Sequence, residues 1–348
     1  MNRFIEEICN RIFQETDVKL LKDKTILITG ANGLIGGFLA DFFHYLNTQH
    51  NFNIKILLTS LSDKPKRIEH LIKKDNIEYY SQDLSIGLSV KHKVDYCFYC
   101  AGYAQPSKFL SDTTTTFFLN TSGVQKTFSD IYKNNKNARC VFLSSSEIYA
   151  LNETETSHKE TDLINVSLEH KRNSYIFGKI GGEMIVNDFV TSGFDAVSAR
   201  VSLCYGPGHL YNDARVMSDI TRKAMSEASN IKLFDDGSAL RRYLHISDFI
   251  IMLLNVSLYG TNSVYNIGGK EEVSIFEMAN HIGKFFNKTI EKGIPNNKVS
   301  LSAPKRVWVS LERYKKEFGE TNFLSFANGI DTYLKWFVNE FKGLQNEK

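Results

Sequence analysis

The stretch TILITGANGLIGG, residues 25–37, decides the fold of this chain of 348 residues. A β-prone run leads into Gly30, and Gly33 and Gly36 follow at the spacing of a strand–turn–helix unit. Small residues there let the backbone turn tightly, approach a pyrophosphate closely and pack the helix against the strand. The helix N-terminus adds free N–H groups and a positive dipole end. The stretch therefore predicts a dinucleotide site, the alternative being a glycine-rich turn without a ligand.

Short β-rich apolar runs alternate with helical patterns in the first part of the chain. Apolar strands separated by helices indicate a parallel sheet covered on both faces. The runs lie at residues 25–30, 54–59, 77–82, 94–100, 139–145 and 195–202. This number of strands is typical of a doubly wound dinucleotide-binding sheet. A further helical pattern covers residues 114–134, and the polar residues 151–170 predict an exposed loop.

We therefore predict an α/β protein with a Rossmann-type doubly wound parallel sheet and a smaller C-terminal substrate-binding lobe. Residues 1–22 form an N-terminal helical extension in this interpretation. Residues 23–205 form the dinucleotide-binding domain, with later returns of the chain to the sheet. Residues 206–348, where the alternation breaks up, form mainly the substrate lobe.

Composition excludes several classes of partner. A formal net charge of +3 does not indicate nucleic acid or an anionic membrane as the main partner. No apolar run approaches the roughly 20 residues that span a bilayer, and the N-terminus does not resemble a signal peptide. Cys97 and Cys100 form a CxxC pair inside an apolar run, but no second ligand pair is visible, so no metal site is predicted. We expect a cytoplasmic protein with reduced thiols.

The stretch NSYIFGK, residues 173–179, places Tyr175 four residues before Lys179. On a helix these side chains share one face, and the lysine can favour tyrosinate. The same spacing occurs at Tyr132 and Lys136 in a polar run, so spacing alone decides nothing. The context comes from FLSSSEIYA, residues 142–150, which follows a predicted central strand. Ligands of parallel sheets bind outside the carboxyl ends of the strands.

The end of the second predicted strand leaves the choice of cofactor open. This position normally carries an acid that holds the adenine ribose, but LLTSLSDKPKR, residues 57–67, has Leu58 and Thr59 there. Lys64, Lys66 or Arg67 can instead meet a 2′-phosphate, so both NAD and NADP remain possible. Asp83, after the third run, can reach the adenine amino group or serve as an ordinary turn aspartate.

The glycine turn, the strand-end serine and Tyr-x-x-x-Lys together resemble the extended short-chain dehydrogenase/reductase superfamily. The resemblance covers about residues 24–340 and includes LNTSG, ARVSLCYGPG (199–208), RRYLHISD (241–248) and YNIGG (265–269). Within the nucleotide-sugar-modifying branch, the nearest pattern is that of the UDP-glucuronate decarboxylase family. The resemblance implies a bound NAD, a nucleotide-sugar substrate and a homodimer.

Site residues are carried over position by position. The resemblance implies four catalytic residues: Ser145, Glu147, Tyr175 and Lys179. Substrate-binding arginines are Arg172, Arg215, Arg241 and Arg306. The cofactor would contact Gly30, Asn32, Gly33, Leu34, Ile35, Gly36, Thr59, Asp83, Leu84, Ala101, Asn120, Tyr175 and Lys179.

The implied reaction oxidises the sugar at C4, releases carbon dioxide from C5 and reduces C4 again. Three departures affect the identity of the sugar: Leu203 replaces the family's asparagine, the ribose-binding acid is missing, and Ala150 replaces the family's glycine after Glu-x-Tyr. Alternatives within the superfamily are a nucleotide-hexose 4,6-dehydratase and a 4-epimerase. Many dehydratases carry an aspartate where this chain has Ser146, although GDP-mannose dehydratases do not, and epimerases usually lack an acid at Glu147. A non-catalytic nucleotide-binding regulator is the alternative from another class.

Overall fold

A computed structural model describes residues 1–348 except 89, 150–155, 227–229, 295–305, 307 and 344–348. At its centre lies a seven-stranded parallel sheet with the strand order β11-β6-β5-β4-β1-β2-β3. Its strands are β1 (Thr25–Thr29), β2 (Lys55–Ser60), β3 (Ile77–Ser81), β4 (Tyr96–Tyr99), β5 (Arg139–Ser145), β6 (Asp195–Val201) and β11 (Val264–Ile267). The predicted doubly wound fold is confirmed. The strand order reverses beside β1, which pairs with both β2 and β4, and ligand sites of such sheets lie at this point.

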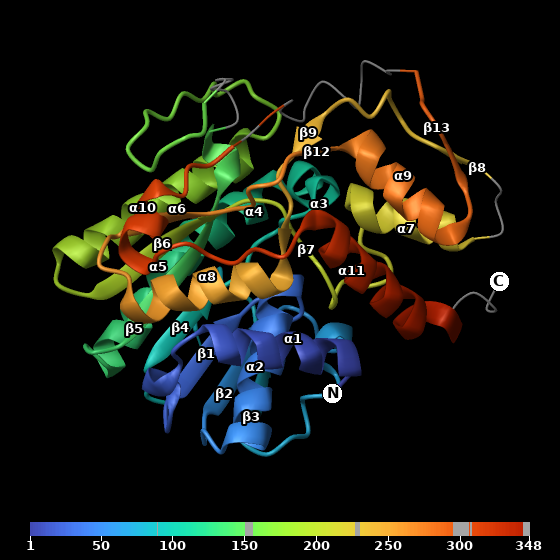
Figure 1. The fold of residues 1–348 in the computed structure, drawn as a ribbon. Coiled ribbons are helices and arrows are strands. Elements are labelled where there is room, and N and C mark those ends of the chain that lie inside the picture. The colour runs from blue at the N-terminus through green and yellow to red at the C-terminus, as the bar shows by residue number, and fades with distance from the viewer. Residues whose placement is uncertain (89, 150–155, 227–229, 295–305, 307, 344–348) are drawn as a thin grey trace.

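Helices cover both faces of the sheet (Figure 1). On one face lie α2 (Leu34–His50) and α8 (Ile246–Tyr259), and α1 (Arg3–Glu15) packs on both of them as an outer layer. The other face is covered by α5 (Ser122–Asn134) and α6 (Asn173–Thr191). Because α8 is enclosed between the sheet and α1, nearly all of its side chains are buried, which explains its almost uninterrupted apolar sequence.

The C-terminal part of the chain builds a second apolar cluster of its own. The helices α7 (Val216–Met225), α9 (Ile275–Phe286) and α11 (Phe326–Phe341) supply most of it and gather at one end of the molecule (Figure 1). Paired short strands complete this part: β7 (Cys204–Tyr205) with β10 (Leu244–His245), β8 (Asn230–Lys232) with β13 (Thr289–Glu291), and β9 (Leu240–Arg241) with β12 (Val273–Ser274). The chain returns to the sheet through α8, β11 and α10 (Glu312–Phe318).

Two local expectations are wrong in detail. The helix expected over 114–134 is divided at Thr121 into α4 (Thr113–Asn120) and α5, because Thr121 leaves helical geometry with ψ of −85°. Its hydroxyl bonds back to the carbonyl of Phe117, a local contact that competes with the helix. The loop expected to be exposed contains His158 and Glu160, which are only 4% and 9% exposed. His158 pairs with the chain at Val309, and this contact draws the loop inward.

The remaining described elements are short. They are α3 (Pro106–Ser111), which lies beside α4, and the 3-10 turns Lys19–Leu21, Lys66–Ile68 and Ser146–Tyr149. No helix in the described part of the chain has the length and apolar character needed to cross a membrane.

Candidate active site

The glycine turn forms a cradle between β1 and α2. Gly30 has φ of +65°, in the region that favours glycine, and a Cβ atom there would lie 2.7 Å from the carbonyl oxygen of Cys100. A Cβ atom on Gly36 would lie 2.6 Å from the oxygen of Gly30. Ala101, after β4, is held at the same edge by a 3.2 Å hydrogen bond from its N–H to Thr29 Oγ1. Neither Gly30 nor Gly36 thus has room for a side chain.

Close packing of α4 against α6 brings Asn120 beside Lys179. A Cβ atom on Gly182 would lie 2.6 Å from the Asn120 carbonyl, and one on Gly178 would lie 3.3 Å from Asn120 Cβ. At Gly102, a Cβ atom would meet Asn120 Oδ1 and Lys179 Nζ at 3.4 and 3.7 Å. The small residues of α6 therefore set how closely the two helices approach. They also place the Asn120 amide at the predicted cofactor edge, which is the end of the sheet where the strands finish and the glycine turn lies.

The structure brings Tyr175, Lys179 and Ser145 together at the carboxyl ends of the central strands. Tyr175 and Lys179 lie on one face of α6, and each is 7% exposed. Lys179 Nζ donates a 2.7 Å hydrogen bond to the carbonyl of Leu143 on β5 and lies 5.7 Å from the centre of the Tyr175 ring. Ser145, the last residue of β5, lies near enough to Tyr175 for its hydroxyl to lower the pKa of the phenol. This geometry suits a hydroxyl pair that binds one substrate oxygen.

Burial dominates the electrostatics of the phenol. It raises the pKa of Tyr175 well above its ordinary value, and the negative charge of Glu147 raises the pKa further. The Ser145 hydroxyl and the positive charges of Arg172 and Arg215 oppose the rise. The sequence predicted that Lys179 lowers the pKa of the phenol. In the protein alone the pKa is raised instead, because burial dominates.

Lys179 responds to the same enclosure. Burial lowers the pKa of its ammonium group to about 7, and the smaller effects of Cys100 and Glu183 oppose this fall. Burial also raises the pKa of the Cys100 thiol strongly, so that thiol is neutral. The protein thus holds Lys179 close to the balance between its charged and neutral forms.

A stack formed by the side chains of Phe109 and Arg172 encloses the phenol of Tyr175. The ring of Phe109, on α3, stacks on Tyr175 with centroids 4.7 Å apart and an angle of 18°. The Arg172 guanidinium lies 5.3 Å from the centre of the same Phe109 ring and donates a 2.6 Å bond to Glu147 Oε1. The second carboxylate oxygen of Glu147 is buried without a hydrogen-bond partner among the described residues. Glu147 therefore presents an acceptor beside the phenol.

The other predicted arginines separate into two groups. Arg241, on β9, lies near enough to Arg172 and Glu147 to interact with them electrostatically. Burial lowers the pKa of Arg241 most, and the positive charge of Arg172 lowers it further. Arg215 precedes α7, influences Tyr175 and forms a two-point pair with Asp213. Arg215 therefore lies within electrostatic reach of the phenol, and Arg241 within reach of the pair of Arg172 and Glu147.

Arg306 belongs to a different arrangement. Its guanidinium lies 4.1 Å from the centre of the Trp308 ring, and its Nη2 is 4.0 Å from Glu272. Trp308 also lies under Arg242, 4.3 Å from ring centre to guanidinium. The contacts described for Arg306 thus connect it to this stack and not to the other predicted arginines.

The end of β2 resolves one of the open choices at the cofactor edge. Thr59, at the position normally occupied by the ribose-binding acid, has a buried Oγ1 without a hydrogen-bond partner among the described residues. The Arg67 side chain is 5% exposed and forms a 2.5 Å ion pair with the fully buried Asp41 of α2. Its backbone N–H also donates to Asn32 Oδ1 at 3.0 Å. Arg67 is therefore committed to supporting the glycine turn and is not available to a 2′-phosphate.

The remaining predicted cofactor residues lie around the same edge. Asp83 Oδ1 accepts the N–H of Ser85 at 2.8 Å, the geometry of an ordinary turn aspartate. Leu84 is 4% exposed and packs into the core beneath α5. Gly33, Leu34 and Ile35 begin α2, with Gly33 as its N-terminal cap.

Sequence reasoning missed several side chains that build this site. Phe109 lies in a short helix with no recognisable signal, although Pro106 marks the start of that helix. Glu183 lies four residues beyond Lys179, so the face already defined by Tyr175 and Lys179 would have indicated it. Its partner Arg200 lies in β6, and only the assembled sheet reveals the pair.

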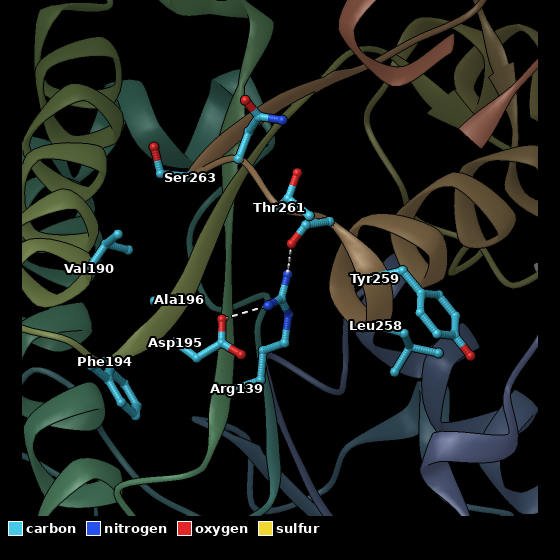
Figure 2. Close-up of a pocket in the computed structure, with 11 residues that line it drawn as sticks. Arg139, Val190, Phe194, Asp195, Ala196, Leu258, Tyr259, Thr261 and Ser263 are labelled. Atoms are coloured by element: carbon cyan, nitrogen blue, oxygen red, sulfur yellow. Dashed lines mark hydrogen bonds and ion pairs between the residues drawn. The ribbon is translucent and has the colours of Figure 1, made fainter. Parts of the chain in front are cut away.

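A separate pocket opens at the opposite end of the strands, where β5 and β6 begin (Figure 2). Arg139 and Asp195, the first residues of β5 and β6, line it and form a 2.5 Å ion pair. Arg139 Nη2 also donates to the carbonyls of Val256 and Gly260, at 3.1 and 2.5 Å, and so closes the C-terminal end of α8. Arg139 therefore has a structural role, and the pocket lies away from the carboxyl ends of the strands, where chemistry is expected.

The fold and the set of Ser145, Tyr175 and Lys179 together define an extended short-chain dehydrogenase/reductase. The model of the NAD dependent epimerase/dehydratase family matches residues 26–268. The chain belongs to this family.

Among its relatives, dTDP-4-dehydro-6-deoxy-D-allose reductase of Streptomyces bikiniensis is 24% identical, with 90% of this chain and 96% of that protein covered. UDP-glucuronic acid decarboxylase 1 of Xenopus tropicalis is 23% identical, with coverage of 95% and 77%. The solved structure of an epimerase from Methanothermobacter thermautotrophicus has a TM-score of 0.82 at 20% identity, covering 97% and 98% of the chains. A dTDP-glucose 4,6-dehydratase from Streptomyces venezuelae, solved with NAD bound, has a TM-score of 0.78 at 16% identity, covering 92% and 99%.

Proposed function

We propose that this protein is an NAD-dependent enzyme that modifies a nucleotide sugar through transient oxidation at C4, and that it decarboxylates UDP-glucuronate. The observation that carries the proposal is the convergence of Ser145, Tyr175, Glu147 and Arg172 at the carboxyl ends of the central strands. Relatives that are UDP-glucuronic acid decarboxylases support the substrate class.

NAD fits the residues present at the cofactor edge. Gly30 and Gly36 let the turn pack tightly where no side chain fits, and α2 begins directly beyond them with N–H groups of its first turn directed outward. Asn120 Oδ1 and Thr59 Oγ1 are buried, without partners among the described residues, and a cofactor would satisfy them. With Arg67 occupied by Asp41, the choice favours NAD over NADP. When bound, NAD supplies a reversible acceptor for hydride.

The protein's own residues handle the proton at the sugar 4-hydroxyl. As the phenolate, Tyr175 takes this proton in the oxidation, and as the phenol it returns the proton when the carbonyl is reduced. The positive charge of bound NAD would favour the phenolate, against the effect of burial. Ser145 holds the same sugar oxygen, since its hydroxyl lies close to the phenol. The enclosure by Phe109 excludes water from the phenol, so proton transfer is directed to the substrate. General acid–base groups of this kind contribute about 10²–10⁴-fold each.

Decarboxylation follows from the position of the ketone. A carbonyl at C4 makes the C5 carboxylate a β-keto acid, so the C5–C6 electron pair can pass into an enolate as carbon dioxide leaves. Protonation at C5 then restores the ketone. The pair of Glu147 and Arg172 lies beside the phenol and orients this side of the ring. Arg241 and Arg215 suit the diphosphate because guanidinium groups bind phosphate oxygens in a bidentate manner.

The test is product identification by mass. Purified protein is incubated with UDP-glucuronate, GDP-mannose and other nucleotide sugars. Loss of carbon dioxide from UDP-glucuronate is the expected result, whereas loss of water would identify a dehydratase, and an unchanged mass with a new stereoisomer an epimerase. Turnover by Tyr175→Phe should fall about 10²–10⁴-fold, and a variant with full turnover would contradict the assignment of the base.

A further inference from the structure

Three successive residues of β5 are tied to one face of α6. The Leu143 carbonyl accepts from Lys179 Nζ at 2.7 Å, and the Ser145 hydroxyl lies near enough to the Tyr175 phenol to lower its pKa. Between them, the Ser144 hydroxyl donates to Glu183 Oε1. Positions 175, 179 and 183 follow at four-residue intervals on one helix, so they form a continuous row facing the strand. Two of these contacts use residues already assigned to catalysis, but the contact between Ser144 and Glu183 does not.

The contact between Ser144 and Glu183 is supported from a second strand. Arg200 on β6 binds both oxygens of the Glu183 carboxylate, with Nε at 3.0 and 3.1 Å and Nη2 at 2.7 Å. The Arg200 and Glu183 side chains are only 7% and 12% exposed. Arg200 Nη1 also donates to the Tyr149 hydroxyl and to the Glu160 carbonyl at 3.0 Å. A buried carboxylate with this many donors has one position available to it.

Distance is the quantity that this arrangement controls. Ser145 ends β5 and Tyr175 lies near the start of α6, so their hydroxyls meet on one substrate oxygen only if strand and helix keep a fixed separation. A displacement of about 1 Å at a reacting centre can cost about 10²-fold in rate. Glu183 acts on β5 through Ser144 and on β6 through Arg200, and it is therefore placed to fix that separation.

We propose that Glu183 is a positioning residue, which together with Ser144 and Arg200 holds the phenol of Tyr175 in register with the hydroxyl of Ser145. The proposal rests on the proposed function, because it assigns a role toward the same oxidation. Glu183 also acts on Lys179 through its negative charge. Among the described residues, Cys100 just after β4, and Tyr175 and Glu183 on α6, are the titratable groups that face Lys179. Glu183 favours the charged form of Lys179.

Ser144→Ala is the decisive variant, because it removes one hydroxyl and leaves the pair of Glu183 and Arg200 intact. Ser257→Ala is its matched control: Ser257 is also buried, and among the described residues its hydroxyl bonds only to the Leu253 carbonyl within α8. With UDP-glucuronate, we expect Ser144→Ala to lower kcat about 10–100-fold, with little change in KM, while Ser257→Ala keeps the wild-type kcat. Equal kcat values for the two variants would overturn the proposal.

A second variant separates position from charge. Glu183→Gln keeps the shape of the side chain but removes its charge, which lowers the pKa of Lys179. The alkaline limb of the kcat–pH profile should therefore move to lower pH in Glu183→Gln and stay in place in Ser144→Ala. Where Glu183→Gln is too unstable to assay because Arg200 is left buried and uncompensated, the kcat of Ser144→Ala decides.

Urea unfolding of the variants at Ser144 and Glu183 and of the double variant tests the contact without turnover. Non-additive losses of stability are expected, and additive losses would overturn the proposal. A wild-type protein that leaves every nucleotide sugar unchanged would instead overturn the proposed function, and the unfolding cycle would still decide whether the contact couples β5 to α6.

Discussion

The substitution Lys179→Met should stabilise the protein while it removes turnover. Burial lowers the pKa of Lys179 from 10.5 to about 7. A difference of this size corresponds to about 4–5 kcal/mol of cost for keeping the charged amine in the folded state. Methionine fills a similar volume without a charge, but it forfeits the hydrogen bond to the Leu143 carbonyl, which is worth about 1 kcal/mol.

The pH dependence follows from the same shift. Below the folded pKa of about 7, both the folded and the unfolded chains hold the proton, and the cost is present in full. Above the unfolded pKa of about 10.4, neither chain holds it, and the cost disappears. Wild-type stability should therefore gain from Lys179 as the pH rises through this window. Lys179→Met should be more stable by about 3 kcal/mol at pH 6 and by only about 1 kcal/mol at pH 9.

Urea denaturation at the two pH values measures both free energies of unfolding. Lys133→Met, on α5 with a side chain 74% exposed, is the control for loss of one ammonium group from the surface. A Lys179→Met protein less stable than the wild type, or an advantage that does not change between pH 6 and pH 9, would refute the reasoning. The first result would mean that the hydrogen bond outweighs burial, and the second that Lys179 does not titrate in this range.

Two further substitutions test the supports of the site. Asp41→Asn should cost about 3–5 kcal/mol of unfolding free energy in urea, because it leaves Arg67 buried without its partner. Burial raises the pKa of Asp41 most strongly, but Arg67 and a hydrogen-bonded histidine outweigh it and lower the pKa, so this stabilisation is present above about pH 4 and lost as the pH falls through the folded pKa. Gly182→Ala should cost about 1–3 kcal/mol relative to Gly343→Ala, since its Cβ atom would lie 2.4 Å from the Phe142 ring while Gly343 has open space. Equal thermal midpoints for the two alanine variants would contradict this view of the helix contact.

The features predictable from the sequence were those with a local cause. The glycine turn and the β-prone runs carry their own periodicity, and the structure has strands at all of them. The seventh strand, β11, was expected only as a return to the sheet, because four residues are recruited by pairing with β6 and not by their own preference. The break at Thr121 between α4 and α5 likewise depends on side-chain contacts that a 3.6-residue pattern does not contain.

The residues of the site were likewise predictable only where their relation depends on local spacing in the chain. Tyr175 and Lys179 are four residues apart, so the chain itself indicates that they share a face. Phe109 and Arg200 come from elements far along the chain, and each becomes relevant only when the sheet brings it to α6. The pKa shifts were unpredictable for the same reason, because desolvation is a property of the assembled enclosure and not of spacing.

The charges around the phenol suggest where an anion would gain most on binding. Arg172 is paired with Glu147, and Arg215 is paired with Asp213 at two points. Arg241 donates a 2.7 Å hydrogen bond to the Leu240 carbonyl. Burial lowers the pKa of Arg241 most, and Arg172 lowers it too, while Tyr243 and Glu147 oppose the fall. A phosphate oxygen close to Arg241 would reverse that effect, since an opposite charge stabilises the protonated form. Despite burial, Asp213 already raises the pKa of Arg215, whereas the pKa of Arg241 is lowered. The negative charge of a diphosphate should therefore change the pKa of Arg241 more than that of Arg215.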